Sequence, residues 1–377
     1  ITMESRFDIA TSSELMAILS LVKDLKELKK RISSIVVAYS KTGNPITTED
    51  LEVSGAMSAL MLPAFNPNLI QTIEGQPVFV HAAPFANIAI GQSSIIADMV
   101  GLKLNEYHVT ECGFGADIGF EKFWNIKCRT SGLKPDVAVL VATLRALKYH
   151  GADKDSPKII PGNPLPKEYI EKNMQWLERG MKNLFHHIKI IKKSGLSIVV
   201  CINKFQSDTH EELDFVRKFC EEMGIPVAIS EHWQKGGQGA LELADFVIDA
   251  CKNNSNFNFL YENSLPHISR IELIAREIYG ADSVEFSPLA LEKLQSINSK
   301  KEFSDFAICI AKTHLSLSDN PLLRGVPEGW QLFIRDILVF YGAKLIVPVA
   351  GEISLMPGTA STPNFRTIDV DLQTGKV

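Results

Sequence analysis

Two aromatic residues stand beside glycine-rich turns, and a third follows an apolar strand. The first, Phe114, lies between Gly113 and Gly115, after the β-prone segment Tyr107 to Thr110. Glycine has no Cβ, so it permits positive φ and close approach of a ligand to the backbone. A strand, a glycine turn and a helix are how α/β proteins present backbone N–H groups to an anionic or planar ligand. We therefore expect Phe114 to lie against a flat ligand.

The spacing of Gly113, Gly115 and Gly119 is similar to the Gly-x-Gly-x-x-Gly fingerprint of dinucleotide-binding proteins, with one spacer residue too many. No acidic residue ends a second strand about 20 residues further on, where those proteins bind the ribose. The pattern disfavours a Rossmann dehydrogenase.

The second aromatic residue, Phe205, follows the apolar run Ile198 to Ile202. Open α/β sheets bind ligands at the carboxyl ends of such strands. The preceding Asn203-Lys204 is similar to the Asn-Lys-x-Asp motif with which GTPases recognise guanine, but Gln206 replaces the aspartate. We therefore disfavour a GTPase, and Phe205 either packs in the core or contacts a ligand.

The third aromatic residue, Trp233, lies in a loop that follows a short strand and contains Gly236, Gly237 and Gly239. Such a loop is a candidate anion-binding helix start, and Trp233 is a candidate stacking surface. The neighbouring His232 could act as a general base, or it could be an ordinary solvent-facing histidine.

Polar residues after two strands have two interpretations each. Arg145, Lys148 and His150 follow the strand 137–143, where cations suit a phosphate or carboxylate but are equally common as solvated surface residues. Asp208 and Thr209 are typical N-caps of a following helix. Two further segments end strands in the same way, 84–91 and 311–318, and the first either lines the ligand cleft or is an ordinary loop.

The composition limits the class of protein. The 377 residues carry a net charge of −5, which argues against a nucleic acid or an anionic membrane bound through a basic surface. No apolar run is long enough for a transmembrane helix, and the first residues lack the pattern of a signal peptide. The six cysteines are scattered without a Cys-x-x-Cys pair, which favours free thiols in a reducing cytoplasm. The histidines do not cluster with them at ligand spacing, which argues against a zinc site, and we expect no metal-ligating residues.

Hydrophobic periodicity predicts how these residues are positioned. Continuous apolar runs such as 137–143 are typical of parallel strands that are covered on both faces, and their alternation with helices predicts an α/β fold. The loop 151–168, rich in Pro and Gly, indicates a boundary. We expect helices over 8–31, 93–104, 168–193, 209–223, 238–252 and 268–278, and strands over 36–39, 78–80, 137–143, 196–202, 227–229, 306–311 and 345–349.

Taken together, these segments resemble formate–tetrahydrofolate ligase, also called formyltetrahydrofolate synthetase. The resemblance runs from Phe7 to the end of the chain. The matching blocks, in order, are Asn66–Leu69, Pro84–Ala89, Gly113–Asp117, Val141–Thr143 with Arg145–Lys148, Trp233 with its glycine loop, Ala311–Thr313 and Met356–Gly358.

The resemblance implies an ATP-dependent ligase that joins formate to N10 of tetrahydrofolate through formyl phosphate. It implies ATP, Mg²⁺, formate and tetrahydrofolate as ligands, with a monovalent cation as a further candidate, and a cytoplasmic homo-oligomer without nucleic-acid or membrane partners. The implied fold is α/β, with mostly parallel sheets flanked by helices. It comprises an incomplete P-loop-NTPase-like main domain (1–155), a second α/β domain with the folate-stacking residues (165–295) and a small C-terminal domain (300–377).

The resemblance also implies three groups of site residues. Phe205 and Trp233 would sandwich the pterin ring, each stacked ring contributing about 0.5–1.5 kcal/mol beyond burial. The nucleotide group is Gly113, Phe114, Gly115 and Asp117; the folate group is Phe205, Gln206, Ile229, Trp233, Gly236 and Gly237; the formyl-phosphate group is Phe85, Asn87, Arg145 and Lys148.

Several features depart from the family pattern. No Gly-x-x-x-x-Gly-Lys-Ser/Thr segment occurs in the 377 residues, so the usual grip on the β- and γ-phosphates is missing. We therefore expect a fragment that lacks an N-terminal segment; the alternative is a non-catalytic ligand-binding homologue or assembly partner. Smaller departures are Asn66 in place of Lys, Ile90 in place of His, Gln206, and the long loop 151–166.

Overall fold

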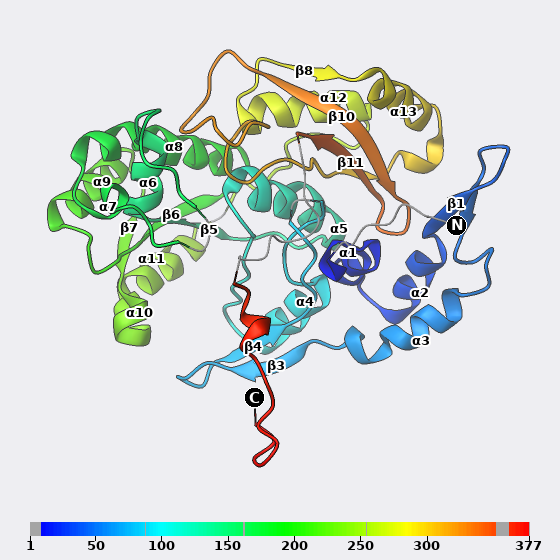
Figure 1. The fold of residues 1–377 in the computed structure, drawn as a ribbon, viewed down its shortest axis with the longest axis horizontal. Coiled ribbons are helices and arrows are strands. Elements are labelled where there is room, and N and C mark those ends of the chain that lie inside the picture. Colours follow the sequence, from blue (N-terminus) through cyan, green and yellow to red (C-terminus); the bar gives the residue numbers. More distant parts are fainter. Residues whose placement is uncertain (1–8, 87, 161–162, 254, 352–361, 377) are drawn as a thin grey trace.

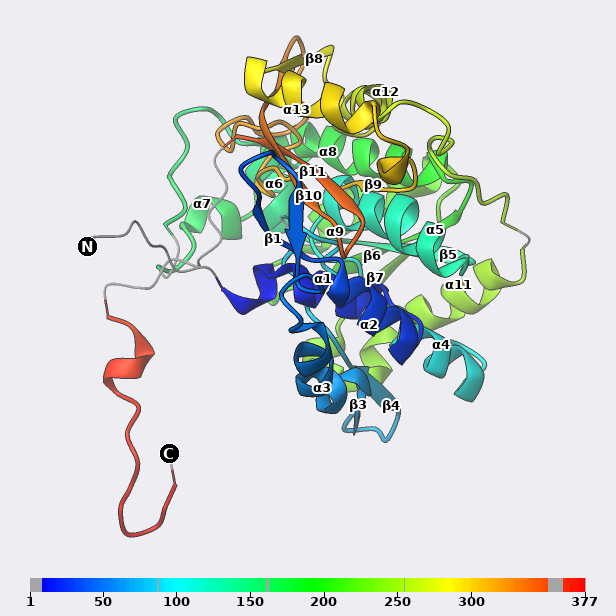
Figure 2. The same ribbon diagram turned by 90° about the vertical axis from the view of Figure 1, so that its right-hand side faces the viewer.

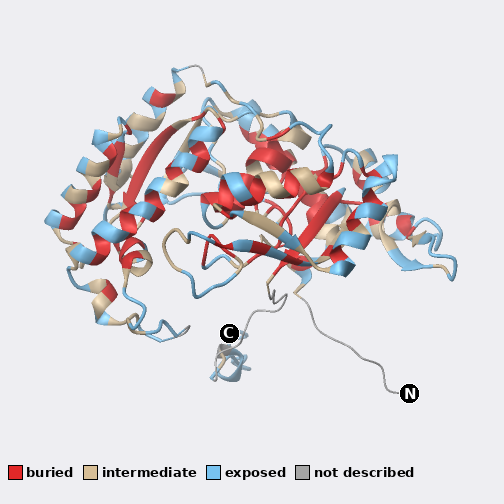
Figure 3. Ribbon diagram, turned by 90° about the horizontal axis from the view of Figure 1, so that it is seen from above, coloured by how far each residue is buried: buried red, intermediate tan, exposed pale blue. Residues whose placement is uncertain are grey.

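The computed structural model describes residues 9–86, 88–160, 163–253, 255–351 and 362–376, and its architecture is α/β (Figure 1). One sheet has the order β5-β6-β7 and is entirely parallel, as the apolar runs predict. Helices contact this sheet, and Figure 3 shows its buried strands lying among helices whose outer residues are exposed. The elements are β5 (Val137–Ala142), α6 (Leu144–Gly151), α7 (Lys167–Ile170), α8 (Met174–Lys193), β6 (Ser197–Asn203), α9 (His210–Glu222), β7 (Val227–Ser230), α10 (His232–Lys235) and α11 (Leu241–Cys251).

The second sheet is mixed and has the order β8-β10-β11-β9. The central pair β10 and β11 is antiparallel, whereas β8 and β9 add to it in parallel. The predicted strand 306–311 is shorter than expected: β9 covers two residues, and an isolated bridge joins Ala311 to Val349. The elements are α12 (His267–Ile274), β8 (Ser283–Phe286), α13 (Pro288–Asn298), β9 (Ala307–Ile308), β10 (Gln331–Phe340) and β11 (Leu345–Ala350).

The N-terminal part consists of helices and two hairpins. The prediction of one helix over 8–31 is wrong, because Val22 is extended and Asp24 caps a second helix by accepting the Glu27 N–H at 2.7 Å. Strands 36–39 and 78–80 exist, but they are largely exposed rather than buried. The elements are α1 (Glu14–Leu21), α2 (Leu25–Ser33), β1 (Val36–Tyr39), β2 (Pro45–Thr47), α3 (Ser54–Phe65), β3 (Asn68–Gln71), β4 (Pro77–Val80) and α4 (Ile95–Leu104).

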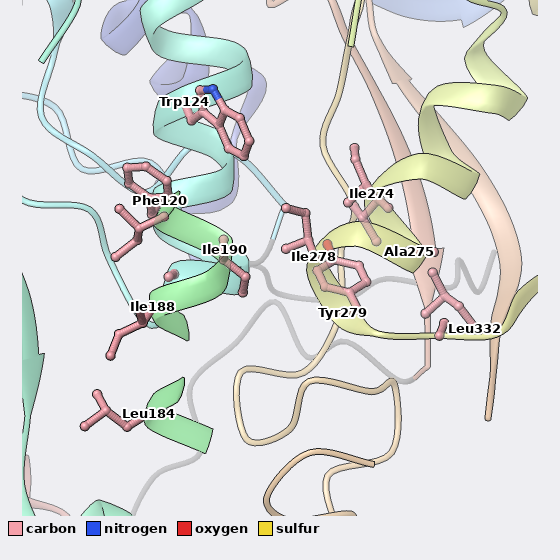
Figure 4. Packing of buried hydrophobic residues seen from close by; sticks show 14 of the residues in the cluster. Phe120, Trp124, Leu184, Ile188, Ile190, Ile274, Ala275, Ile278, Tyr279 and Leu332 are labelled. Atoms are coloured by element: carbon pink, nitrogen blue, oxygen red, sulfur yellow. The ribbon is translucent and has the colours of Figure 1, made fainter. Parts of the chain in front are cut away.

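The larger hydrophobic core joins parts of the chain that are far apart in sequence. Figure 4 shows Phe120 and Trp124, from the π-helical segments Ala116–Phe120 and Phe123–Cys128, together with residues of α8, α12 and β10. Trp124 is fully buried, and its Nε1–H donates to Asn258 O at 2.7 Å. This packing fixes the glycine turn at 113–115 against the centre of the molecule.

Both sheets cross the domain boundaries that the sequence predicts. β5, from the first predicted domain, pairs with β6 of the second, and β8 of the second pairs with β10 of the third. The division into three domains therefore stays a prediction. Figure 2 shows the same elements from the side, with segment 362–376 extending away from the body. No helix in the described ranges is long and apolar enough to cross a membrane.

Candidate functional site

The carboxyl ends of β5, β6 and β7 lie along one edge of the parallel sheet. Ala142 pairs with Ile202, and Asn203 pairs with Ser230. This register brings together the segments that follow the three strands, so Arg145, Phe205 and Trp233 gather at one edge. The structure thus assembles residues that the sequence spreads over almost 90 positions.

Arg145 and Phe205 are in direct contact at this edge. The guanidinium carbon lies 3.7 Å from the centre of the Phe205 ring, and Nη2 lies 3.4 Å from Ser207 Oγ. Thr143 positions the arginine, because its hydroxyl caps α6 by accepting the Ala146 N–H. Arg145 Nε is buried and has no hydrogen-bond partner in the described ranges. One face of the Phe205 ring is therefore covered by the Arg145 guanidinium.

Trp233 presents its indole to solvent from the short helix α10. Its exposed fraction is 90%. The loop is closed at its base, because Glu231 N–H donates to Gly239 O at 2.9 Å. Lys204 ties the loop to the end of β6 through a 2.8 Å ion pair with Glu231 Oε1. A large exposed aromatic ring on a well-anchored loop is typical of a ligand-stacking surface.

The glycine turn that follows Trp233 binds a carboxylate. Gly237 N–H donates to Glu74 Oε1, on the hairpin between β3 and β4, at 2.7 Å. The predicted anion-binding turn therefore holds an acidic side chain of the same molecule. The other residues of the predicted folate group flank it: Gln206 and Gly236 are exposed, and Ile229 is partly buried in β7.

Lys148 does not reach the edge with Arg145. It is fully buried on α6, where Nζ lies 3.1 Å from Glu212 Oε1 and donates to Glu171 O at 2.8 Å. Glu212 also completes a capping box with Thr209, which confirms Thr209 as the N-cap of α9. Lys148 therefore joins α6 to α9 instead of facing the ligand edge. A buried cation pairs with an acid because desolvation without a partner is costly.

The two neighbouring histidines have ordinary surroundings. His150 Nδ1 accepts the Gly325 N–H at 3.1 Å, and burial, reinforced by His187, lowers the pKa of His150 to about 4. His150 is therefore neutral at pH 7. His232 is exposed and contacts Ser230 Oγ through Nδ1 at 2.8 Å.

Phe114 has an unusual backbone conformation. Its φ is +65°, in the left-handed region that costs a non-glycine residue about 1–3 kcal/mol. Its ring stacks on His314, with centroids 4.5 Å apart and planes at 15°, and remains 50% exposed. Gly119 lets the turn close, because a Cβ there would overlap Gly113 O. The protein thus holds a half-exposed aromatic ring in a strained position, which favours a binding role.

Asp117 lies behind this turn and is buried. Its carboxylate pairs with the buried Lys312 at 2.8 Å. Burial alone would raise the pKa of Asp117, but Lys312 and His187 outweigh burial and hold the pKa below its ordinary value. Burial lowers the pKa of His187, and its Nδ1 has no partner in the described ranges. The ion pair of Asp117 with Lys312 therefore stabilises the glycine turn from its buried side.

The loop after β4 borders the same glycine turn. A Cβ on Gly113 would lie 2.9 Å from Gly91 O, so the two turns are packed together. Phe85 is partly buried against the N-terminal core, and its N–H donates to Thr11 O at 2.7 Å. Ile90 is fully buried in that core. The predicted residues Asn87 and Met356–Gly358 lie outside the described residues, and Asn66 is an exposed residue at the end of α3.

Sequence reasoning missed three residues of these sites. Lys312 and His314 follow a predicted strand, in a segment that carries a cation and hydroxyls. The sequence contains no signal that Lys312 pairs with Asp117 or that His314 stacks on Phe114. Glu74 sits in a hairpin without any local signal. All three depend on contacts between residues far apart in the sequence.

The fold is α/β, with a parallel sheet whose carboxyl edge carries Arg145, Phe205 and Trp233, and with a glycine turn that carries Phe114. The family model for formate–tetrahydrofolate ligase matches residues 1–377, and the chain belongs to this family. A formate–tetrahydrofolate ligase from Desulforapulum autotrophicum is 60% identical over 375 residues, and one from Lawsonia intracellularis is 61% identical over 375 residues. A third, from Desulfotalea psychrophila, is 59% identical over 376 residues.

These alignments cover all of this chain but only part of the relatives. The chain spans 63% of the first two relatives and 67% of the third. Over a third of the length of the first two relatives therefore has no counterpart among these 377 residues.

Proposed function

We propose that this chain supplies the folate side and the adenine side of a formate–tetrahydrofolate ligase site. The reaction joins formate to N10 of tetrahydrofolate with ATP, through formyl phosphate. The observation that carries the proposal is the gathering of Phe205 and Trp233 at one sheet edge, through the pairing of Asn203 with Ser230. A planar pterin held between two aromatic rings gains about 0.5–1.5 kcal/mol from each beyond burial.

The folate group of this site comprises Phe205, Gln206, Ile229, Trp233, Gly236 and Gly237. Arg145, over Phe205, is the cation of the formyl-phosphate group nearest to the pterin surface. Its buried Nε, unpartnered in the described ranges, gives it a donor for a phosphate or formyl oxygen. Phe85 and Asn87 complete this group, whereas Lys148 acts through the packing of α6 against α9.

The nucleotide part is the turn Gly113–Gly115, with Phe114 as the surface for the adenine ring and Asp117 as its buried support. The β- and γ-phosphates are gripped by a polypeptide segment outside these 377 residues, and we propose that the first part of the chain belongs to a P-loop-NTPase-like domain. Two exposed valines on β5 support the proposal that a further polypeptide segment packs against this strand. Val139 is 39% and Val141 is 59% exposed, although β5 is all-apolar and lies at the edge of its sheet. Apolar parallel strands are normally covered on both sides.

Mg²⁺ would accompany ATP in this reaction. Within the described ranges no three His, Cys, Asp or Glu side chains group as metal ligands. Mg²⁺ that accompanies a nucleotide is usually held by phosphates, water and one or two carboxylates, and we derive no step through the ion. A monovalent cation, a homo-oligomer and a cytoplasmic location are further parts of the proposal that follow from the family.

A second candidate is a non-catalytic homologue or assembly partner that binds ligand without turnover. The absence of a Gly-x-x-x-x-Gly-Lys-Ser/Thr segment from the 377 residues favours it.

One experiment separates the two candidates. Formation of 10-formyltetrahydrofolate from ATP, formate and tetrahydrofolate is measured for this chain alone and after mixing with the remaining N-terminal part of a relative. The ligase proposal expects turnover in the mixture that falls when Trp233 is changed to Ala. Tetrahydrofolate binding without turnover in either sample would favour the non-catalytic candidate, and absence of binding would reject both.

A further inference from the structure

Glu74 connects two distant parts of the molecule at the candidate folate site. It lies at the tip of the β3–β4 hairpin, which reaches toward α10 in Figure 1. Its Oε1 accepts the Gly237 N–H at 2.7 Å, across 163 positions of sequence. A Cβ on Gly237 would overlap both carboxylate oxygens, and one on Gly236 would lie 3.2 Å from Oε1. The two glycines thus form a flat surface on which this carboxylate lies.

Only one oxygen of the Glu74 carboxylate is engaged by the glycine turn. No ion pair in the described ranges involves Glu74, and the two lysines that pair with Glu231 are engaged there. Lys235 pairs with Glu231 at 2.6 Å and Lys204 pairs with it at 2.8 Å. In the described ranges Oε2 has no hydrogen bond with another side chain or backbone group. A carboxylate oriented by an amide, with a free oxygen, is a strong acceptor for a ligand N–H.

Glu74 contacts the same closed loop that carries Trp233. Trp233 precedes Gly237 by one helical turn, and the closed loop 231–239 holds both. A flat ring stacked against Trp233 would therefore direct an edge toward the rim of the loop where Glu74 lies. The pterin of tetrahydrofolate carries two adjacent donors on one edge, the 2-amino group and the N3–H. This pair resembles the fork of a guanidinium, which carboxylates bind with two parallel hydrogen bonds.

We propose that Glu74 is a specificity-determining residue that accepts hydrogen bonds from the 2-amino and N3–H donors of the pterin. The inference rests on the proposed function, since it assigns a ligand edge to the same site. Aromatic stacking tolerates any flat ring, whereas a charged acceptor selects rings with donors at this edge. Sites built to hydrogen-bond a donor reject analogues that lack it.

The test is a titration of the chain with tetrahydrofolate and with its analogue in which hydrogen replaces the 2-amino group. Glu74→Gln is the informative variant, because the amide oxygen can still accept the Gly237 N–H while the charge and the second acceptor are lost. We expect this variant to weaken tetrahydrofolate binding by about 10- to 100-fold, the range for a hydrogen bond to a charged group. The analogue keeps the N3–H donor but lacks the 2-amino donor, so Glu74→Gln should weaken its binding clearly less than it weakens that of tetrahydrofolate. Glu262→Gln, at an exposed glutamate outside the site, is the matched control and should leave both affinities unchanged.

The outcomes distinguish this inference from the proposed function. Equal weakening of both ligands by Glu74→Gln would show that Glu74 only orders the loop, which overturns the inference. Tighter binding of tetrahydrofolate would also overturn it, because Glu74 would then be a competitor for the glycine turn. If Trp233→Ala weakens binding while Glu74→Gln does not, the inference fails and the proposed function stands. If the unchanged chain binds no tetrahydrofolate, both fail.

Discussion

The Asp117 carboxylate and the Lys312 ammonium lie 2.8 Å apart in a buried ion pair that joins the two segments of the Phe114–His314 stack. Lys312 also donates to Thr313 O at 3.0 Å and to Ser316 O at 2.5 Å, so the pair fixes the loop that carries His314. The positions of Phe114 and His314 therefore depend on a buried ion pair behind them.

Changing Asp117 to Asn leaves Lys312 buried without its counter-charge. Removing one partner of a buried pair costs about 3–5 kcal/mol, so the free energy of unfolding in urea should fall by about that amount. The double variant Asp117→Leu with Lys312→Met should recover most of the loss, because an apolar pair has no desolvation cost. A single variant as stable as the unchanged chain would contradict the structural role of this pair.

The strained backbone at Phe114 predicts that glycine is tolerated there better than alanine. Because φ is +65°, Phe114→Gly relieves strain that Phe114→Ala keeps, and the glycine variant should be more stable by about 1 kcal/mol. Both variants should weaken ATP binding about 2- to 10-fold, since each removes the ring. Thermal unfolding and calorimetric titration measure the two effects. The control is Phe333→Ala, at an exposed ring on β10, and undiminished ATP binding by Phe114→Gly would exclude Phe114 from the nucleotide site.

Glu121 is expected to make the free energy of unfolding fall as the pH rises. It is fully buried, and burial raises its pKa from 4.5 to about 7, opposed by a hydrogen bond from Asn125. The folded state thus holds the proton more tightly than the unfolded state. Its stabilising contribution is complete below about pH 4.5 and is lost as the pH rises to about 7, a change of about 3 kcal/mol.

Glu121→Gln should remove this slope and raise the free energy of unfolding at pH 8. The matched control Glu106→Gln changes an exposed glutamate and should keep the slope. The measurement is urea unfolding from pH 4.5 to 8, and a slope unchanged in Glu121→Gln would show that another group is responsible.

Lys148 is expected to matter for stability rather than for ligand binding. Lys148→Met removes the partner of Glu212 and should lower the free energy of unfolding by about 3–5 kcal/mol. At a temperature where the variant is folded, its tetrahydrofolate affinity should be unchanged. Lys252→Met breaks the exposed pair with Asp249, which water screens, and should leave the free energy of unfolding almost unchanged. If Lys148→Met lowered the affinity for tetrahydrofolate without lowering the free energy of unfolding, Lys148 would belong to the formyl-phosphate group after all.

Local signals predicted much of the fold. The run Ile198–Ile202 is continuously apolar because it lies inside a parallel sheet, and Thr209 begins α9 through its own capping box. The strand β10 escaped prediction because its alternation is interrupted by Arg335 and Asp336, where a bulge shifts the register.

Only the aromatic part of the candidate site could be proposed from the local sequence, and its role in ligand binding stays a prediction. Phe205 and Trp233 follow β6 and β7, and the parallel pairing of these strands places both residues at one edge of the sheet. The burial of Lys148 depends on Glu212, which is 64 positions away, and the hold on Gly237 depends on Glu74, which is 163 positions away. Contacts between residues so far apart in the sequence leave no pattern in the local sequence.

The pairing of Phe205 and Trp233 around a pterin is the central claim, and calorimetric titration with tetrahydrofolate tests it most directly. Phe205→Ala and Trp233→Ala should each weaken binding about 2- to 10-fold beyond the loss of buried area. Tyr39→Ala removes a 60% exposed aromatic ring on β1, far from α10 in Figure 1, and should change nothing. Binding of tetrahydrofolate as tight in Trp233→Ala as in the unchanged chain would contradict the account.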